Sequence, residues 1–384
     1  MTNIDLPRRF EEFTEARKNG FLKVKEIKEN GGKVAGVFCT FTPREILDAA
    51  GIFSVGLCGM SDETIVYAEA DLPKNLCPLI KSSYGFAITE KCPYTYFSDI
   101  IIGETTCDGK KKMYELLSEV KDTYIMQLPQ GIDREYASEM WKSELYRLIK
   151  TLENKFGVKI SEDKLRKAAA LRNKQRKLYC EFFELGKLDP PAIKGYDMYK
   201  IIEGAGFSFD LEENCRKLRD LIDSTKKSYT EGNRPVEKDA KRILVTGCPI
   251  GGVLDKVINS IETNGGVVVC FENCGGIKPV RSMVDENAAD IVGAIADRYL
   301  DIGCSVMTPN LKRMEMIPLL LKEFRIDGVI EIVLQACHTY NVETKAVKRL
   351  VNDIGIPYMA VETDYSKSDL GQMKTRVSAF IEMV

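Results

Sequence analysis

Twelve cysteines and a single histidine, His338, are the residues of this 384-residue sequence best suited to metal chemistry. Zinc sites usually mix cysteine with histidine or use Cys-x-x-Cys pairs, whereas iron–sulfur clusters are held mainly by thiolates. The sequence contains no Cys-x-x-Cys pair, and its closest thiols are Cys270 and Cys274. This composition favours an iron–sulfur centre over a zinc site, with buried structural cysteines as the alternative.

The stretch GETTCDGKKKMYELL, which begins at Gly103, places Cys107 after an apolar run and before three lysines. A helix that begins here offers unpaired backbone N–H groups and the positive end of its dipole to an anion. Lys110, Lys111 and Lys112 would add positive charge, although we expect at least one of them to be solvated. The stretch therefore suits a thiolate that holds an anionic cluster.

The elements that must position the cysteines alternate between strand and helix in two parts of the chain. In the first part, apolar runs end near Cys39, Cys58 and Cys107, and a helix is expected to begin at Cys77. Such alternation predicts a parallel sheet that is covered by helices on both faces.

The second part repeats this order after a helical middle segment. Strands are expected to end near Cys274 and Cys337, and a helix to begin after Cys304. We therefore expect an α/β protein with two doubly wound, flavodoxin-like parallel-sheet domains joined by a helical segment. The predicted ranges are 1–132 for the N-terminal α/β domain, 133–236 for the helical segment and 237–384 for the C-terminal α/β domain.

Doubly wound sheets bind ligands outside the carboxyl ends of their strands. Six thiols are predicted at these ends and would meet in one cleft if the two edges faced each other. The alternative is coincidence, because short strands and twelve cysteines allow many chance placements. We expect a cluster between the domains, and the six thiols are Cys58, Cys77, Cys107, Cys274, Cys304 and Cys337.

The charge and hydropathy of the chain exclude some classes of protein. Charged residues make up 29% of the sequence and the formal net charge is -2, which argues against nucleic acid as the main partner. No apolar run approaches the roughly 18 residues of a membrane span, and the first residues lack the apolar stretch of a signal peptide. We expect a cytoplasmic protein. The Gly-rich turn TGCPIGGVLDK lacks the Gly-Lys-Ser/Thr of a nucleotide loop, so no ATPase activity of its own is expected.

Several motifs resemble the 2-hydroxyacyl-CoA dehydratase and benzoyl-CoA reductase family over nearly the whole chain. They are FCTFTPREILDAAG, NLCPLIKSSYG, GETTCDGKKKMYE, LQACHTY and ETDYSKSDLGQMKTRVSAFIEM. The resemblance implies two α/β domains with a [4Fe-4S] cluster between them, held by three cysteines in each subunit. The family motifs match Cys77, Cys107 and Cys337 here.

The additional cysteines resemble the branch of this family called double-cubane cluster proteins. This implies an [8Fe-9S] cluster, in which two [4Fe-4S] units are bridged by a sulfide and held by six cysteines. The second unit is assigned to Cys274, Cys304 and Cys58, with Cys39 as the main rival to Cys58. Of the other cysteines, Cys248 is left out of the ligand set, and the four expected to be structural are Cys92, Cys180, Cys215 and Cys270.

The resemblance also implies an ATP-dependent reductase of a small, hard-to-reduce substrate. Its low-potential electrons would come from a separate, dimeric iron–sulfur activator ATPase, to which a homodimer of this chain would offer a matching two-fold surface. His338 is the candidate proton donor, with Glu104 and Glu272 as further candidate acids. One alternative is a 2-hydroxyacyl-CoA dehydratase subunit with a single [4Fe-4S] cluster, and another is a non-catalytic electron carrier.

Overall fold

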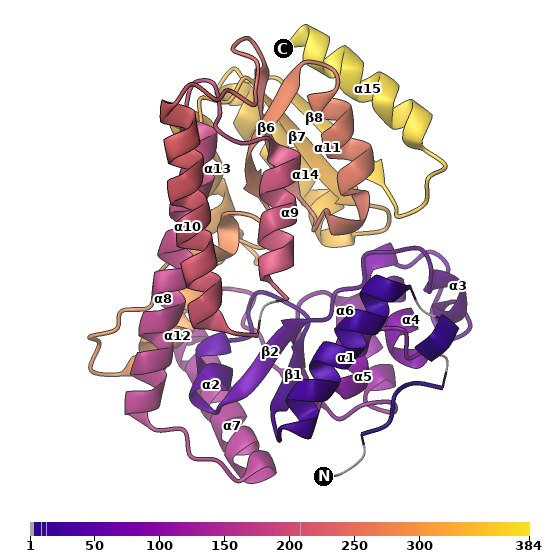
Figure 1. Cartoon of the computed structure of the whole chain (residues 1–384), viewed down its shortest axis with the longest axis vertical. Coiled ribbons are helices and arrows are strands. Elements are labelled where there is room, and N and C mark those ends of the chain that lie inside the picture. Colours follow the sequence, from indigo (N-terminus) through magenta and orange to yellow (C-terminus); the bar gives the residue numbers. More distant parts are fainter. Residues whose placement is uncertain (1–3, 9, 13, 208) are drawn as a thin grey trace. The chain divides into compact units, whose positions relative to one another are not determined.

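The structure is a computed structural model that describes residues 4–8, 10–12, 14–207 and 209–384 (Figure 1). The chain divides into two compact units. Unit 1 consists of Met1–Ala170 and Val284–Leu300, and unit 2 consists of Leu171–Met283 and Asp301–Val384. The chain therefore passes between the units three times.

Unit 1 is built on a four-stranded parallel sheet with the strand order β2-β1-β3-β4. Strand β3 is buried along its whole length because helices cover both faces of the sheet. The strands are β1 (Lys33–Val37), β2 (Ile52–Gly56), β3 (Ile100–Glu104) and β4 (Thr123–Met126). The helices are η1 (Phe10–Glu12), α1 (Glu15–Glu29), α2 (Arg44–Ala49), α3 (Ile65–Ala68), α4 (Pro78–Ile88), α5 (Pro93–Phe97), α6 (Asp108–Leu117), α7 (Ala137–Phe156) and α12 (Ile291–Leu300).

Unit 2 has a second parallel sheet with the order β6-β5-β7-β8. The strands are β5 (Lys241–Gly247), β6 (Gly266–Glu272), β7 (Gly328–Leu334) and β8 (Tyr358–Thr363). The helices are η2 (Leu185–Lys187), α9 (Gly195–Ala205), α10 (Leu211–Thr230), η3 (Gly251–Val253), α11 (Leu254–Glu262), η4 (Lys278–Val280), α13 (Leu311–Glu323), α14 (His338–Asp353) and α15 (Leu370–Met383). Helix α8 (Glu162–Glu184) contributes residues to both units.

The two strand orders are the same when the strands of each unit are numbered from its first strand. This is the flavodoxin-like order, in which the first strand lies between the second and the third. The predicted fold class, two doubly wound α/β units, is therefore confirmed. The division at 132/133 and 236/237 stays a prediction, and its first two ranges contain residues 1–3, 9, 13 and 208, which lie outside the described part.

Helix α12 belongs to unit 1 although it follows most of the strands of the chain. The hydroxyl of Tyr299 on this helix donates a hydrogen bond to Glu45 at 2.8 Å and accepts one from the backbone N–H of Arg44 at 3.0 Å. Lys142 on α7 pairs with Asp290 just before α12 at 2.6 Å. The late helix therefore completes the packing of an early sheet.

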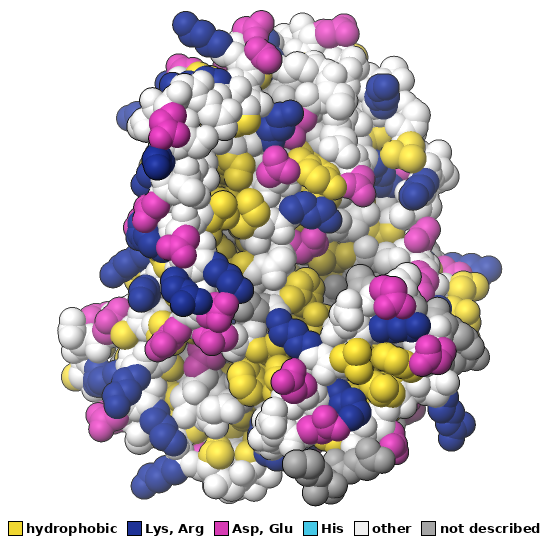
Figure 2. Space-filling model, in the orientation of Figure 1, with side chains coloured by type: hydrophobic (Ala, Val, Ile, Leu, Met, Phe, Trp, Pro, Cys, Tyr) yellow, Lys and Arg dark blue, Asp and Glu magenta, His cyan; other side chains and the backbone are white. Residues whose placement is uncertain are grey.

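The surface of the described residues mixes charges of both signs. On the face that Figure 2 shows, lysine and arginine side chains are interspersed with aspartate and glutamate. No helix among these residues combines the length and the apolar character that a membrane crossing requires.

Candidate metal centre

Three cysteines follow strands or begin helices at the carboxyl edge of the sheet in unit 1, which we call the first edge. Cys58 lies two residues after the end of β2, and Cys107 lies three residues after the end of β3. Cys107 is the N-cap residue of α6, and Cys77 is the N-cap residue of α4. Neither thiol makes a side-chain capping hydrogen bond. The N-terminus of α6 therefore suits an anion, whereas α4 begins with Pro78, which has no N–H, and the N–H of Ile80 donates to the Cys77 backbone oxygen.

Unit 2 repeats this arrangement at the second edge, the carboxyl edge of its own sheet. Cys274 lies two residues after the end of β6, and Cys337 lies three residues after the end of β7 and is the N-cap residue of α14. Cys304 precedes α13, the helix that leads into β7. Because β6 and β7 occupy the places that β2 and β3 have in unit 1, each thiol of one edge has a counterpart at the other. The matched pairs are Cys58 with Cys274, Cys77 with Cys304, and Cys107 with Cys337.

Cys39 and Cys248 form a different pair, because they follow the equivalent central strands β1 and β5. Cys248 is buried, and its sulfur accepts a hydrogen bond from the backbone N–H of Leu334 at 3.4 Å. Its side chain therefore helps to join the ends of β5 and β7.

A glycine brings the two helix starts of the first edge together. A Cβ atom on Gly109 would come within 2.9 Å of a methyl of Leu76 and 2.8 Å of a methyl of Ile80. Only glycine allows α6 to pack this closely against the start of α4. Cys77 and Cys107, which cap these two helices, are thereby held at one place within unit 1.

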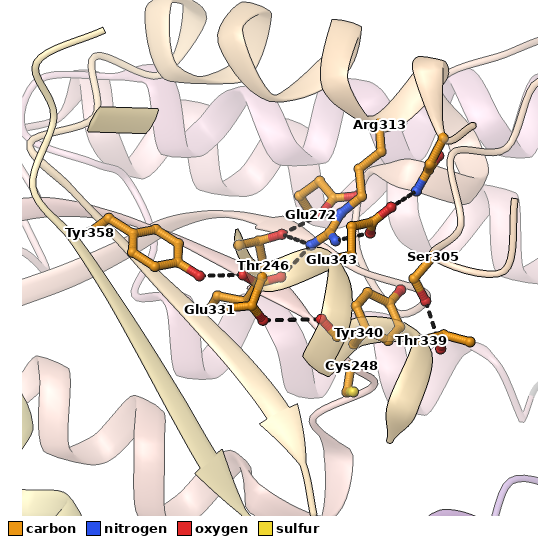
Figure 3. A network of polar contacts seen from close by, with 12 residues as sticks. Thr246, Cys248, Glu272, Ser305, Arg313, Glu331, Thr339, Tyr340, Glu343 and Tyr358 are labelled. Atoms are coloured by element: carbon orange, nitrogen blue, oxygen red, sulfur yellow. Dashed lines mark hydrogen bonds and ion pairs between the residues drawn. The ribbon is translucent and has the colours of Figure 1, made fainter. Parts of the chain in front are cut away.

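Polar side chains join the corresponding segments of the second edge. The hydroxyl of Ser305, next to Cys304, donates to the hydroxyl of Thr339 at 3.0 Å (Figure 3). The same hydroxyl lies 3.9 Å from the sulfur of Cys337. The loop that carries Cys304 is therefore tied to the beginning of α14.

One buried lysine faces the thiols of the first edge. The ammonium of Lys110 donates to the backbone oxygen of Phe38 at 3.0 Å, and the thiol of Cys58 donates to the same oxygen at 2.9 Å. Burial lowers the pKa of Lys110, but the negative charges that Tyr114, Cys39, Cys58 and Glu104 can carry raise it well above its ordinary value. Lys110 is therefore a permanent cation beside these thiols.

The other two lysines of this stretch lie outside. The side chain of Lys111 is 42% exposed and pairs with Asp108, and that of Lys112 is 72% exposed and pairs with Glu115. Of the three lysines expected to provide a positive field, only Lys110 is buried against the thiols. The expectation that at least one of them is solvated agrees with this arrangement.

Glu104, the last residue of β3, is fully buried near Lys110. Burial raises its pKa to about 7, against the opposing effects of the Thr42 hydroxyl that donates to it and of Lys110. Its second carboxyl oxygen, Oε2, has no hydrogen-bond partner, and the buried hydroxyl of Tyr114 has none either. The first edge thus contains polar atoms that protein groups do not satisfy.

The second edge contains a denser network, centred on the fully buried Arg313 (Figure 3). Its guanidinium pairs with Glu272 at 3.2 Å and with Glu331 at 2.9 Å, and it also pairs with Glu343. It donates a further hydrogen bond to the hydroxyl of Thr246 at 2.8 Å. Each of its three nitrogens thus pairs with a different carboxylate, which a guanidinium with five N–H donors can do.

A second buried cation, Lys278, connects this network to the thiols. Its Nζ lies 2.9 Å from Glu272 and 3.1 Å from the hydroxyl of Tyr340. Burial lowers the pKa of Lys278, but Glu272 raises it, and the thiols of Cys274 and Cys304 add to that effect. Burial acts to raise the pKa of Glu272, but Lys278 and Arg313 hold it below its ordinary value.

Sequence reasoning did not single out Arg313, Lys278 or Tyr340. For Arg313, its position along the helix carried a usable signal. Arg313 lies on the same stripe of α13 as the buried residues Ile317 and Leu320, so its position predicts burial. A charged residue on an apolar stripe signals a buried ion pair, because an unpaired charge there would cost too much free energy.

The candidate proton donor His338 is the first residue of α14 and is exposed. The other candidate acids, Glu104 and Glu272, are fully buried. His338 is therefore the one of the three that solvent reaches directly.

The remaining cysteines have packing roles in the structure. Cys92 is the N-cap residue of α5, and its sulfur accepts from the N–H of Thr95 at 3.5 Å. The thiol of Cys180 on α8 donates to the backbone oxygen of Val280 at 3.5 Å. Cys215 and Cys270 are buried in α10 and β6. These contacts agree with structural roles.

The donor set suits an iron–sulfur cluster rather than a single metal ion. Within the described residues, no group of three or more histidine, cysteine, aspartate or glutamate side chains is close enough to hold a single ion. A cubane does not require this, because each thiolate binds a different iron. The thiols at each edge, the helix N–H groups and the buried lysines suit an anionic cluster, and unsatisfied polar atoms surround the thiols of the first edge.

Fold and site together define a two-unit α/β protein that carries thiols at matching strand ends and helix starts of its two sheets. The chain belongs to the 2-hydroxyglutaryl-CoA dehydratase, D-component, family, whose model matches residues 39–384. This confirms the family expected from the sequence motifs. Proteins of this family are generally iron–sulfur proteins.

Individual relatives cover much or nearly all of the chain. A protein of Escherichia coli (strain K12) named "Putative dehydratase subunit YjiM" is 52% identical over 381 residues, 99% of each chain. The (R)-phenyllactyl-CoA dehydratase beta subunit of Clostridium sporogenes is 26% identical over 94% of each chain. A benzoyl-CoA reductase subunit of Thauera aromatica is 24% identical over 62% of this chain and 60% of its own. The relatives are thus subunits of dehydratases and of a reductase.

Proposed function

We propose that this chain is an iron–sulfur reductase that holds an [8Fe-9S] double-cubane cluster with Cys58, Cys77, Cys107, Cys274, Cys304 and Cys337. The observation that carries the proposal is the matched placement of three thiols at each sheet edge. A single [4Fe-4S] cluster held by three cysteines would leave half of this repeated arrangement without a purpose.

Such a cluster, when bound, supplies electrons one at a time at low potential. The chain's own residues would orient and neutralise it. Cys107 and Cys337 begin helices, so the first N–H groups of α6 and α14 would donate to an anion held there. Lys110 and Lys278 would add the charge of two buried ammonium groups.

The electrons would come from a separate, dimeric iron–sulfur protein that hydrolyses ATP. The family resemblance implies such an activator, and this chain has no nucleotide loop of its own. A homodimer of this chain would present it with a matching two-fold surface. For each pair of electrons the substrate, a small and hard-to-reduce molecule, would also take up two protons.

Protons could reach the substrate from two kinds of group. His338 is exposed at the start of α14, directly after Cys337, so it can exchange protons with solvent. Glu104 is buried with a pKa of about 7, so it can hold a proton near neutral pH. We assign His338 as the proton donor and Glu104 as the secondary candidate. The cytoplasm, where thiols stay reduced, is the proposed location.

The second candidate function is that of a 2-hydroxyacyl-CoA dehydratase subunit with one [4Fe-4S] cluster. The names of the relatives favour it, because most of them are dehydratase subunits. In that case Cys77, Cys107 and Cys337 would be the ligands, and the thiols Cys58, Cys274 and Cys304 would be structural.

Iron and sulfide analysis of anaerobically purified protein separates these functions. The double cubane requires about eight irons per chain, the single cluster about four, and a protein without iron would contradict both. Electron paramagnetic resonance of the reduced protein provides an independent check of the cluster type.

A turnover assay tests the reductase and its partner. Substrate reduction should require this protein, the activator, a strong reductant and ATP together. Full-rate reduction without ATP would contradict gated electron delivery, and cluster reduction without any turnover would favour the electron carrier. If light scattering finds a monomer, the proposal of a two-fold docking surface is wrong.

A further inference from the structure

The two edges place a buried ammonium beside thiols, but they obtain it from different parts of the fold. Lys110 lies on α6, three residues after Cys107, and the corresponding residue on α14, three residues after Cys337, is Tyr340. In unit 2 the ammonium instead belongs to Lys278 in η4, which approaches the Tyr340 hydroxyl at 3.1 Å. The two ammonium groups therefore do not occupy equivalent positions, and only that of Lys278 is paired with a carboxylate, that of Glu272 at 2.9 Å.

The charge of Lys110 is only partly balanced within the protein. The residue is only 8% exposed, and its ammonium hydrogen-bonds the Phe38 backbone oxygen. None of the described carboxylates forms an ion pair with it, and the neighbouring carboxyl of Glu104 has a pKa of about 7. A buried cation without an ion-pair partner is destabilising. An anion from outside the polypeptide, or a new charge on the thiols, would complete the balance in unit 1.

Thiols are the groups placed to supply this negative charge. The Cys58 thiol and the Lys110 ammonium donate to one oxygen, that of Phe38, at 2.9 Å and 3.0 Å, so they lie side by side. Cys39 is a further electrostatic neighbour of Lys110. A thiol is neutral, but it becomes a thiolate when it binds a metal. Metal binding would therefore create the missing anion.

We propose that Lys110 is the counter-charge of the metal-bound thiolates of unit 1 and that it sets the reduction potential of the centre. The identity of the metal cluster rests on the function proposed above. Lys110 is a positioning residue, since it acts through the thiolates. A fixed cation favours the more negative, reduced state of a cluster, so it raises the reduction potential.

The test compares Lys110→Met with Lys112→Met in anaerobically purified, iron-loaded protein. Both variants lose one positive charge from α6, but the side chain of Lys112 is 72% exposed, so water and salt screen it. In a redox titration followed by electron paramagnetic resonance, Lys110→Met should shift the potential to a more negative value. It should also lose iron to a chelator faster than the wild type. Lys112→Met should match the wild type in both measurements.

Thermal unfolding of the iron-free full-length chain separates this role from a structural one. At neutral pH, Lys110→Met should raise the melting temperature of the iron-free chain, because burial raises the pKa of Cys58 and of Tyr114 and these neutral groups do not offset the ammonium. A lysine needed only for packing would instead lower the stability with and without iron. A change in stability of opposite sign in the iron-free and the iron-loaded protein is therefore what a counter-charge predicts.

Two results would overturn the proposal. If Lys110→Met has the same reduction potential as Lys112→Met, Lys110 has no role as a counter-charge, while the proposed function is left intact. Wild-type protein that holds no iron after anaerobic purification overturns the proposed function and the counter-charge together.

Discussion

At the first edge, the buried carboxyl of Glu104 faces one buried cation, Lys110, whereas at the second edge Glu272 faces two, Lys278 and Arg313. The pKa of Glu104 is raised to about 7, and that of Glu272 is lowered. Burial acts in the same direction on both carboxyls, so the number of cations decides the outcome. The same spacing of thiols is thus combined with two different balances of buried charge.

This difference shows that the two units are not equivalent in their buried charges although their thiols are placed alike. The second edge satisfies its charges within the protein, through the network around Arg313 (Figure 3). At the first edge Lys110 donates to the backbone oxygen of Phe38 but forms no ion pair with a described carboxylate, whereas both edges contain buried polar atoms without hydrogen-bond partners. We infer that a bound anion would matter more to the charge balance of the first edge than to that of the second.

The largest expected effect comes from removing a thiol that the comparison pairs across the units. Cys58→Ala should lose much of the iron, as should Cys274→Ala, because these residues occupy matching places after β2 and β6. Iron analysis after anaerobic purification provides the measurement.

Removing the rival ligand, Cys39, should have a much smaller effect on the iron content than removing Cys58. Cys39 matches Cys248, which bonds to the backbone of Leu334, so Cys39→Ala should keep its iron. Cys180→Ala, which removes a thiol from within α8, serves as the control and should also keep it. Iron loss in Cys39→Ala with full occupancy in Cys58→Ala would reverse the assignment.

Next in size is the loss of the central cation of the second edge. Arg313→Met should lower the free energy of unfolding by about 3–5 kcal/mol, because Glu331 and Glu343 would lose their paired charge. Denaturant unfolding measures the change. Lys312→Met, the neighbouring residue with a 41% exposed side chain, is the matched control and should change stability little. Equal stability of the two variants would show that the network contributes nothing.

The pH dependence of stability should differ in sign at the two edges. The pKa of Glu104 is about 7 in the folded chain, against an ordinary value of 4.5, so the folded state binds this proton more tightly. Its contribution is complete below about pH 4.5 and is lost as the pH rises to about 7, a loss of about 3 kcal/mol. In the iron-free chain, Glu104→Gln should abolish this decline.

Glu272 should show the opposite behaviour. Its pKa is lowered in the folded chain, so its contribution is present above the ordinary pKa of 4.5 and is lost as the pH falls below it. Glu272→Gln should therefore destabilise the chain at neutral pH and leave it less sensitive to acid. Unfolding curves at several pH values would contradict the comparison if both variants changed stability in the same direction.

The smallest expected effect concerns the threonines that donate to these carboxyls. Thr42→Val removes a hydrogen bond to Glu104, which is partly protonated, and should cost about 1 kcal/mol. Thr246→Val removes one to the charged Glu272 and also the acceptor of Arg313, so it should cost about 2–3 kcal/mol. Thermal unfolding of the two variants side by side tests this ranking.

Much of the architecture could be predicted because strands and cysteines are adjacent in the sequence. Runs such as GVVVCFENC and GVIEIVLQAC place the end of a buried strand next to a thiol, and both strands form as expected. The parallel order follows from the alternation of these runs with helices. The thiols at the strand ends therefore follow from local patterns.

The charge balance could not be predicted, because it depends on groups that are distant in the sequence. Three consecutive lysines have the same chemistry, and the packing of α6 decides that only Lys110 is buried. The pairing of Arg313 with Glu272, Glu331 and Glu343 joins a helix, two strands and a second helix. No local pattern specifies which carboxylates such an arginine selects.

The late return of α12 to unit 1 has a consequence for biosynthesis. The last strand of this unit ends at Met126, but its packing is complete only when Leu300 has been made. At about 5–20 residues per second, a ribosome needs roughly ten seconds or more for the intervening chain. During that interval Cys58, Cys77 and Cys107 belong to an unfinished unit. Insertion of the proposed cluster would then follow translation of α12.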